Sequence, residues 1–405
     1  MKIIDIKDKI NSVITDVLFR PLSEDTKGDM EDKMPPLSLL IKPASSNCNL
    51  RCKYCFYHSV AESRNIKSYG IMSKETLERM VEKALKYADY ACAFAFQGGE
   101  PTLAGLEFYK ELIRLQKKYN HKNLRIDNSI QTNGMLIDDD WAKFLADNKF
   151  LVGLSLDGPK DINDTNRVDL NGEGSFSRIM KTADLFNKYG VEYNILSVIN
   201  GNVANHTTKV YNFFKKHDLR YIQFIPCLDP LGEKPGSLLY SLTPDKYARF
   251  LKTLFDRWYS DIVKGDIMSI RFFDNIVGMA MGYKPEACGM SGQCACQFVV
   301  EADGSIYPCD FYVIDEWCLG NIKDKDLDEL KNSEAGKRFV EVSKHIDPKC
   351  RECRWFDLCR GGCRRNREPF VDGKPSLNNF CSSYEKFFEY TIKRIYHLAE
   401  MLSRR

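Results

Sequence analysis

Six short apolar runs alternate with longer amphipathic stretches between Pro35 and about Pro230. The runs lie around residues 38–43 and at 93–97, 126–131, 150–155, 193–198 and 221–225. Apolar positions repeat at helical spacing in stretches such as 73–88, which opens with Ser73 as the expected N-cap, and 176–190. This alternation predicts parallel strands joined by crossover helices. Periodicity alone does not separate a barrel from an open, Rossmann-like sheet.

The loops are more informative, because each unusual polar or cysteine-bearing motif directly follows one of the apolar runs. GGEP follows 93–97, TNG follows 126–131 and LDG follows 150–155. In a parallel barrel such loops gather on the C-terminal face, where active sites are built. Since six strand–helix units are fewer than eight, the sequence predicts an α/β protein with a partial (β/α)6 TIM-type barrel.

The chain is expected to divide into five parts. Residues 1–33 form a leader that is helical or flexible, with a partner-docking helix as the alternative. The barrel spans 34–240, a connecting helical region spans 241–284, a cysteine-rich domain spans 285–381, and a closing helix spans 382–405.

Composition limits which cellular compartment and which classes of binding partner are expected. A net charge of +3 and 43% hydrophobic residues describe a globular protein without an overall charge that favours nucleic acid or membranes. Charged residues interrupt the apolar positions near the N-terminus, which is unlike a secretion signal. No apolar run approaches the roughly 20 residues that span a bilayer. We therefore expect a cytoplasmic protein. In a reducing compartment its 15 cysteines are more readily metal ligands than disulfides.

Three cysteines, Cys48, Cys52 and Cys55, follow the first strand with C-x3-C-x2-C spacing. A structural zinc site needs four ligands, and His58 is a candidate fourth. A cubane iron–sulfur cluster has four irons, so three thiolates leave one iron open. The position at a barrel mouth, among aromatic residues that can pack an adenine and shield a reactive species, favours the cluster.

The GGEP motif supplies Gly98, Gly99 and Glu100 after the second strand. Glycines at a strand end let a ligand approach the backbone, and the carboxylate suits an ammonium-bearing ligand. Alone, the motif is equally compatible with a tight turn.

Together, C-x3-C-x2-C with an aromatic before its third cysteine, and GGEP about 40 residues later, resemble the radical S-adenosylmethionine superfamily. The resemblance implies that Cys48, Cys52 and Cys55 hold a 4Fe-4S cluster. Its open iron is chelated by the amine and carboxylate of S-adenosylmethionine.

The later cysteines resemble the twice-clustered, SPASM-type extension of peptide-modifying radical enzymes, most specifically in the run C-x2-C-x5-C-x3-C. The resemblance implies a crossed arrangement of two further 4Fe-4S clusters, three in all. One set is Cys288, Cys294, Cys309 and Cys363; the other is Cys350, Cys353, Cys359 and Cys381. Cys296 is left over, or replaces Cys294. Closely spaced zinc ribbons are the alternative.

Within that superfamily, segments such as FAFQGGEPTLAGLEF and CQFVVEADGSIYPCDFYV resemble the anaerobic sulfatase-maturating enzymes. The resemblance implies oxidation of a Cys or Ser in a sulfatase peptide, C/S-x-P/A-x-R, to Cα-formylglycine. It also implies a reduced flavodoxin- or ferredoxin-type electron donor, and a monomer is the default expectation. Another SPASM peptide maturase, forming a thioether or crosslink, is the runner-up. A zinc-ribbon nucleic-acid or scaffold protein is the alternative of a different class.

The resemblance also implies roles for single residues. Those around S-adenosylmethionine are Tyr54, Gly98, Gly99, Glu100, Ser155, Arg167 and Leu228, and those along the peptide channel are Tyr57 and Gln97. Asp310 is expected to be the base that takes the heteroatom proton, with its pKa raised by shielding from Phe311 and Tyr312. A turn aspartate and a surface arginine are the alternatives for Asp310 and Arg167. The basic run 349–367 is expected to offset cluster charge, to bind nucleic acid or to be solvated surface.

Overall fold

One ten-stranded sheet organises the protein in the computed structural model, which describes residues 36–403. The predicted leader, 1–33, lies outside this range. The sheet order is β10-β9-β8-β1-β2-β3-β4-β5-β6-β7, and every pair from β8 through β7 is parallel. The strands are β1 (Leu37–Ile41), β2 (Ala91–Phe96), β3 (Arg125–Thr132), β4 (Leu151–Ser155), β5 (Tyr193–Ile199), β6 (Tyr221–Pro226), β7 (Ser269–Ile270), β8 (Val299–Val300), β9 (Ser305–Tyr307) and β10 (Gly320–Asn321).

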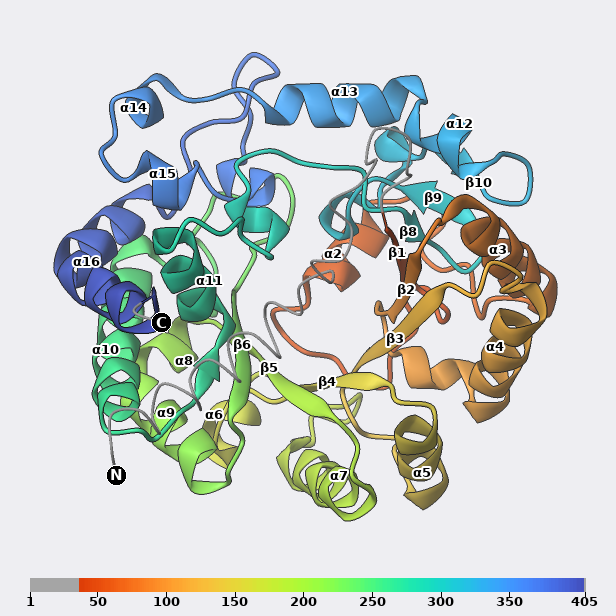
Figure 1. Cartoon of the computed structure of the whole chain (residues 1–405), viewed down its shortest axis with the longest axis horizontal. Coiled ribbons are helices and arrows are strands. Elements are labelled where there is room, and N and C mark those ends of the chain that lie inside the picture. Colours follow the sequence, from red (N-terminus) through yellow and green to blue (C-terminus); the bar gives the residue numbers. More distant parts are fainter. Residues whose placement is uncertain (1–35, 404–405) are drawn as a thin grey trace.

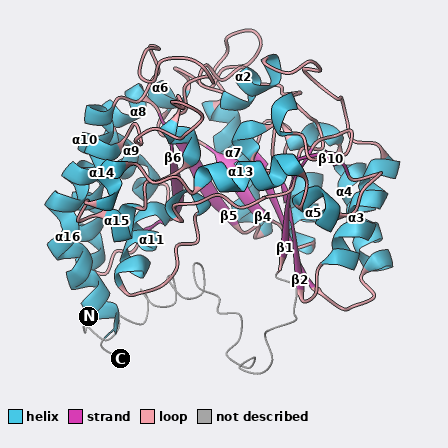
Figure 2. Cartoon of the chain, turned by 90° about the horizontal axis from the view of Figure 1, so that it is seen from above, coloured by secondary structure: helices cyan, strands magenta, loops and turns pink. Residues whose placement is uncertain are grey.

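Helices cover the outer face of the sheet, so the partial barrel is confirmed (Figure 1). The barrel helices are α2 (Phe56–Glu62), α3 (Lys74–Tyr87), α4 (Leu106–Tyr119), α5 (Asp139–Asp147), α6 (Lys160–Asn163), α7 (Phe176–Tyr189), α8 (Gly201–Asn205) and α9 (Thr207–Lys216). The later helices are α10 (Pro244–Val263), α11 (Arg271–Ala280), α12 (Leu327–Lys331), α13 (Glu334–Ser343), α14 (Pro348–Arg351), α15 (Phe356–Cys359) and α16 (Cys381–Ser403). Figure 2 shows the strands enclosed by this helical shell.

All six predicted strands form, and they pair in chain order. The sheet has additional strands: β7 extends it beyond β6, and β8–β10 extend it at the β1 edge. The predicted connecting region therefore contains a short strand as well as helices α10 and α11. The domain boundaries themselves stay predictions.

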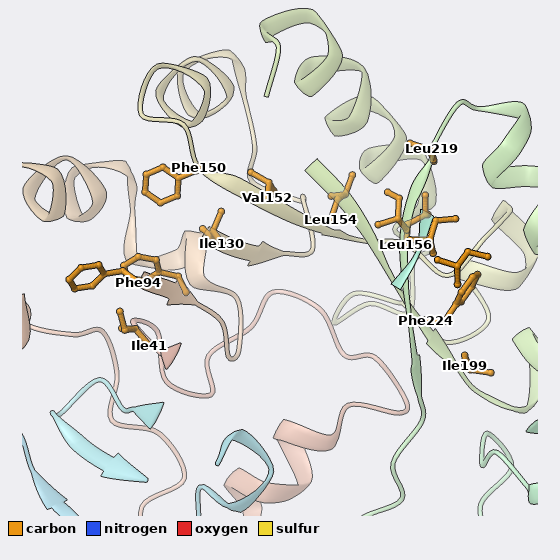
Figure 3. Packing of buried hydrophobic residues seen from close by; sticks show 14 of the residues in the cluster. Ile41, Phe94, Ile130, Phe150, Val152, Leu154, Leu156, Ile199, Leu219 and Phe224 are labelled. Atoms are coloured by element: carbon orange, nitrogen blue, oxygen red, sulfur yellow. The ribbon is translucent and has the colours of Figure 1, made fainter. Parts of the chain in front are cut away.

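Alternation along the strands explains the core. Side chains such as Ile41, Phe94, Ile130 and Val152 come from neighbouring strands and are buried between the sheet and its helices (Figure 3). The expected helix signals also operate. The Ser73 hydroxyl accepts a hydrogen bond from the Thr76 N–H, 3.1 Å, at the start of α3.

The closing helix is confirmed as α16, which begins at Cys381 and packs against α10 and α11. Phe387 on α16 lies 5.8 Å, between ring centroids, from both Phe255 on α10 and Phe273 on α11. Among the described residues, no helix is long and apolar enough to cross a membrane.

Pairing of β8 with β1 determines where the site lies. Leu40 is opposite Val299 and Ile41 is opposite Val300, and the Lys42 N–H donates to the Val300 carbonyl at 2.8 Å. The segment after β8 therefore runs beside the loop that carries the first three cysteines.

Candidate active site

The three-cysteine loop connects β1 to α2 at the C-terminal end of the barrel strands, as predicted. Cys48 and Cys52 are half-buried and Cys55 is exposed. Burial raises the pKa of the Cys48 thiol to about 12 and that of Cys52 to about 11. The Leu50 N–H, 3.4 Å, and the side-chain amide of Asn133, 3.8 Å, both donate to the Cys48 sulfur.

These thiols fit an iron–sulfur cluster. Burial disfavours the thiolates of Cys48 and Cys52, a cost that cluster irons would offset, and N–H donors to sulfur tune such clusters. In the part of the chain that the structure describes, no three His, Cys, Asp or Glu side chains converge on a single metal ion. A cubane does not require such convergence, because each thiolate binds its own iron. The alternative zinc ligand His58 is exposed on α2.

Glu100 holds the GGEP turn against its neighbours. The carboxylate is 1% exposed and accepts hydrogen bonds from the Thr102 N–H (3.0 Å), the Thr102 hydroxyl (2.6 Å), the Thr132 hydroxyl (2.7 Å) and the Asn133 N–H (2.8 Å). Three of these donors bind Oε1 and one binds Oε2, so the carboxylate positions this turn on β3. The predicted contact of Glu100 with a cofactor ammonium stays a prediction.

The two glycines are required by close packing. A side chain at Gly99 would meet the Asn47 carbonyl at 2.2 Å, because the turn lies directly on the cysteine loop. The Glu100 N–H donates to the same carbonyl at 2.8 Å. At Gly98, with φ +110°, an added Cβ would lie 2.7 Å from Cγ of Lys42. The motif thus keeps the backbone close to the loop, and its predicted contact with the cofactor stays a prediction.

A buried polar group lies behind the cysteine loop. Arg167, 5% exposed, donates to the Tyr54 hydroxyl at 3.1 Å, and Tyr54 donates to Asp157, which is fully buried. The surface alternative for Arg167 is therefore wrong. Its Nε–H has no protein partner among the described residues, which leaves a donor for a bound anionic group such as a carboxylate. Asp157 is a member of this group that sequence reasoning missed.

The remaining predicted cofactor contacts lie at the same end of the barrel. Ser155 ends β4 and accepts a hydrogen bond from the Gln131 side chain at 2.9 Å. Leu228 follows β6 and lines a cavity of about 210 Å³ that Arg365 and Glu368 also line. Their roles stay predictions.

The predicted base and peptide-channel residues come together around a lysine that the sequence reasoning missed. Asp310 forms an ion pair with Lys42, and its second oxygen accepts from the Gln97 side chain at 3.0 Å. The Lys42 ammonium lies 3.8 Å from the centroid of the Tyr57 ring. Phe311 packs on Phe56, with 5.0 Å between ring centroids. The direct partner of Asp310 is thus a buried cation, and its aromatic shielding stays a prediction.

Tyr57 continues this network away from Asp310. Its hydroxyl donates to Glu301, which is fully buried and receives a second hydrogen bond from Arg64 at 2.7 Å. Burial raises the pKa of Tyr57 well above its ordinary value. The tyrosine is consequently a fixed neutral ring, suitable as one wall of a channel.

The later cysteines form two groups with the crossed membership that the resemblance implies. Cys288, Cys294, Cys309 and Cys363 line one cavity. Cys350, Cys353, Cys359 and Cys381 line a second. Cys296 lines neither of these two cavities. Burial raises the thiol pKa to about 12 for Cys363 in the first group and for Cys359 in the second. Four cysteines around each cavity fit the four irons of a cubane cluster.

The last three arginines of the basic run are internal, whereas its first basic residues, Lys349, Arg351 and Arg354, are exposed. Arg364, Arg365 and Arg367 are all buried and donate to backbone carbonyls. The positive charges of Arg364 and Arg367 lower the pKa of Cys294 against the larger effect of burial. This arrangement favours charge compensation.

Comparison with known proteins now connects these features. Residues 43–214 match the Radical SAM superfamily and residues 288–354 match an iron–sulfur cluster-binding (SPASM) domain. The cysteine-type anaerobic sulfatase-maturating enzyme of Clostridium perfringens is 56% identical over 366 residues, covering 90% of this chain and 99% of the relative. This chain belongs to the anaerobic sulfatase-maturating enzymes.

A serine-type relative and a solved structure extend the comparison. The serine-type enzyme of Bacteroides thetaiotaomicron is 36% identical over 374 residues, covering 88% of this chain and 89% of the relative. The solved structure of native anSMEcpe with bound AdoMet and Cp18Cys peptide superposes with a TM-score of 0.87 at 54% identity, covering 90% of this chain and 99% of that one. The chain is therefore a radical S-adenosylmethionine oxidoreductase with iron–sulfur clusters.

Proposed function

We propose that this protein oxidises a cysteine side chain in a sulfatase peptide to Cα-formylglycine. The observation that carries the proposal is the meeting of Asp310, Gln97 and Tyr57 beside the three-cysteine loop at one end of the barrel. Identity of 56% to a cysteine-type relative, against 36% to a serine-type one, favours cysteine as the substrate side chain.

The cluster that binds S-adenosylmethionine would be held by Cys48, Cys52 and Cys55. When both are bound, the cluster and S-adenosylmethionine would supply a 5′-deoxyadenosyl radical able to take a Cβ hydrogen atom. Arg167 has a free, buried donor for the cofactor carboxylate. Tyr54 and Asp157 keep that guanidinium oriented. We assign Gly98, Gly99, Ser155 and Leu228 to the walls of the same pocket.

Asp310 takes the thiol proton of the substrate in this proposal. Lys42 pairs with one carboxylate oxygen and Gln97 donates to the other, so the base is oriented before substrate arrives. The two later cysteine groups would hold two more 4Fe-4S clusters, whose chemistry is one-electron transfer. A flavodoxin- or ferredoxin-type protein would be the electron donor, and the protein would act as a monomer.

The test is mass spectrometry of a peptide containing Cys-x-Pro-x-Arg after anaerobic incubation with enzyme, reductant and S-adenosylmethionine. A matched Ser peptide shows the side-chain preference, and a Cys48→Ala variant is the control that lacks one cluster ligand. We expect an aldehyde that reacts with a hydrazine, formed faster from the Cys peptide. Formation of 5′-deoxyadenosine with an unchanged peptide would contradict the proposal and favour a maturase for another peptide class.

A further inference from the structure

Lys42 is a buried cation whose surroundings are built around it. The side chain is fully buried at the end of β1, although lysine is rarely buried unless it is paired. Its ammonium contacts the Asp310 carboxylate on one side and the face of Tyr57, 3.8 Å from the centroid, on the other. The cation is thus paired with a carboxylate that lies 268 residues further along the chain.

The neighbouring strands leave a defined path for this side chain. The Lys42 N–H is bonded to Val300, and the adjacent Gln97 N–H donates to the Ile41 carbonyl at 2.9 Å. An added Cβ at Gly98 would lie 2.7 Å from both Cγ and Nζ of Lys42. The first glycine of GGEP therefore makes room for the lysine, which is a second, independent sign that its position matters.

Two barrel strands consequently hold a carboxylate that belongs to the C-terminal region. The Lys42 ammonium binds Oδ1 of Asp310 and the Gln97 amide binds Oδ2. The Asp310 side chain keeps 13% exposure, so it remains reachable from the barrel mouth. Donors on both oxygens fix the plane of the carboxylate.

We propose that Lys42 is a positioning residue for Asp310, a role that rests on the proposed function. It holds the carboxylate where one oxygen receives the proton of the substrate S–H group as a Cβ hydrogen atom is removed. The competing explanation is mechanical: the ion pair would only fasten β1 to the C-terminal region. Lys83 provides a matched comparison, because it links α3 to the same region through Asp326, 3.3 Å, and the Lys325 carbonyl, 2.9 Å.

The experiment compares Lys42→Met, Lys42→Arg and Lys83→Met with wild type, all as anaerobic holoenzyme of measured iron content. Formylglycine and 5′-deoxyadenosine are quantified in the same reactions over a range of peptide concentrations. Misplacing a reacting group by about 1 Å costs on the order of 100-fold in rate. We expect Lys42→Met to lower kcat for formylglycine by about that factor. The peptide KM and 5′-deoxyadenosine formation should change far less than this kcat. Tyr57 stays anchored through Glu301, and the substitution leaves the backbone of Gly98 unaltered.

The variants separate the explanations. Partial recovery by Lys42→Arg, which keeps the cation, together with a wild-type product ratio in Lys83→Met, supports positioning. Full formylglycine turnover in Lys42→Met, or parallel loss of both products in Lys42→Met and Lys42→Arg, overturns it. Wild-type enzyme that makes 5′-deoxyadenosine but no aldehyde overturns the proposed function itself and this role with it.

Discussion

Asp274 should make the stability of this protein depend on pH. The side chain is 3% exposed on α11, where the Ser269 hydroxyl donates to it at 2.7 Å. Burial raises its pKa from 3.8 to about 7, and the charge of Glu286 adds to the effect. Asp274→Asn keeps the shape and an oxygen that can accept from Ser269, but it removes the titration.

The magnitude follows from the difference between the two pKa values. They differ by about 3, and one pKa unit corresponds to about 1.36 kcal/mol, so the full effect is ~4 kcal/mol. Below pH 3.8 both states are protonated and the contribution is complete. Between pH 3.8 and about 7 unfolding releases a proton, so rising pH favours the unfolded chain. Above about pH 7 the loss is complete and the pH dependence ends.

Urea unfolding of wild type and Asp274→Asn, followed by fluorescence and circular dichroism at equal iron content, tests this reasoning. From about pH 5 to 7 the wild type should lose about 2–3 kcal/mol of unfolding free energy relative to the variant, with no further change above that range. Asp245→Asn is the control, because Asp245 is exposed and pairs with Lys386 on the surface. A gap between wild type and Asp274→Asn that stays constant from pH 5 to 8 would refute the assignment.

Three further substitutions address the site. Asp310→Asn should retain 5′-deoxyadenosine formation but lower the rate of formylglycine formation by a factor of about 10²–10⁴, measured by mass spectrometry. Equal loss of both products would contradict a role as base. Cys294→Ala should reduce the amount of bound iron, whereas Cys296→Ala should not, because Cys294, unlike Cys296, lines the cavity with Cys288, Cys309 and Cys363. Iron analysis measures the difference, and the reverse result would exchange the two assignments. Gly99→Ala should displace the cysteine loop and lower iron content and cofactor affinity, because the added methyl group would lie 2.2 Å from the Asn47 carbonyl. Wild-type values of both would show that the loop accommodates the methyl group.

The long elements of the barrel were predictable because each carries a full period of its pattern. Strands β1–β6 and helices α3 and α7 fall where apolar alternation and helical spacing place them. Strands β7, β8 and β10 have two residues each, and β9 has three. Segments that short carry no periodicity, so the extension of the sheet at both edges was not visible in the sequence.

The sequence predicted which residue types form the candidate site better than it predicted which residues contact each other there. The cysteines, Arg167 and Asp310 are conspicuous in motifs, but their buried partners are not. Lys42 ends an apolar strand and resembles an ordinary strand terminus. Asp157 resembles a turn aspartate. Glu100 was conspicuous by its charge, but the four internal donors that hold it come from Thr102, Thr132 and Asn133, which its motif does not reveal.

The pairing of β8 with β1 explains why these contacts could not be read from local sequence. It covers the edge of the barrel next to the cysteine loop, and its register places Val300 opposite Ile41. Glu301 then follows β8 and reaches Tyr57, while Asp310 returns from β9 to meet Lys42. Cys309 precedes that aspartate and joins Cys363 in one cavity. A single two-residue strand pairing therefore brings the proposed base, its lysine and one proposed cluster ligand to the barrel mouth, so the C-terminal region completes the active site as well as carrying clusters.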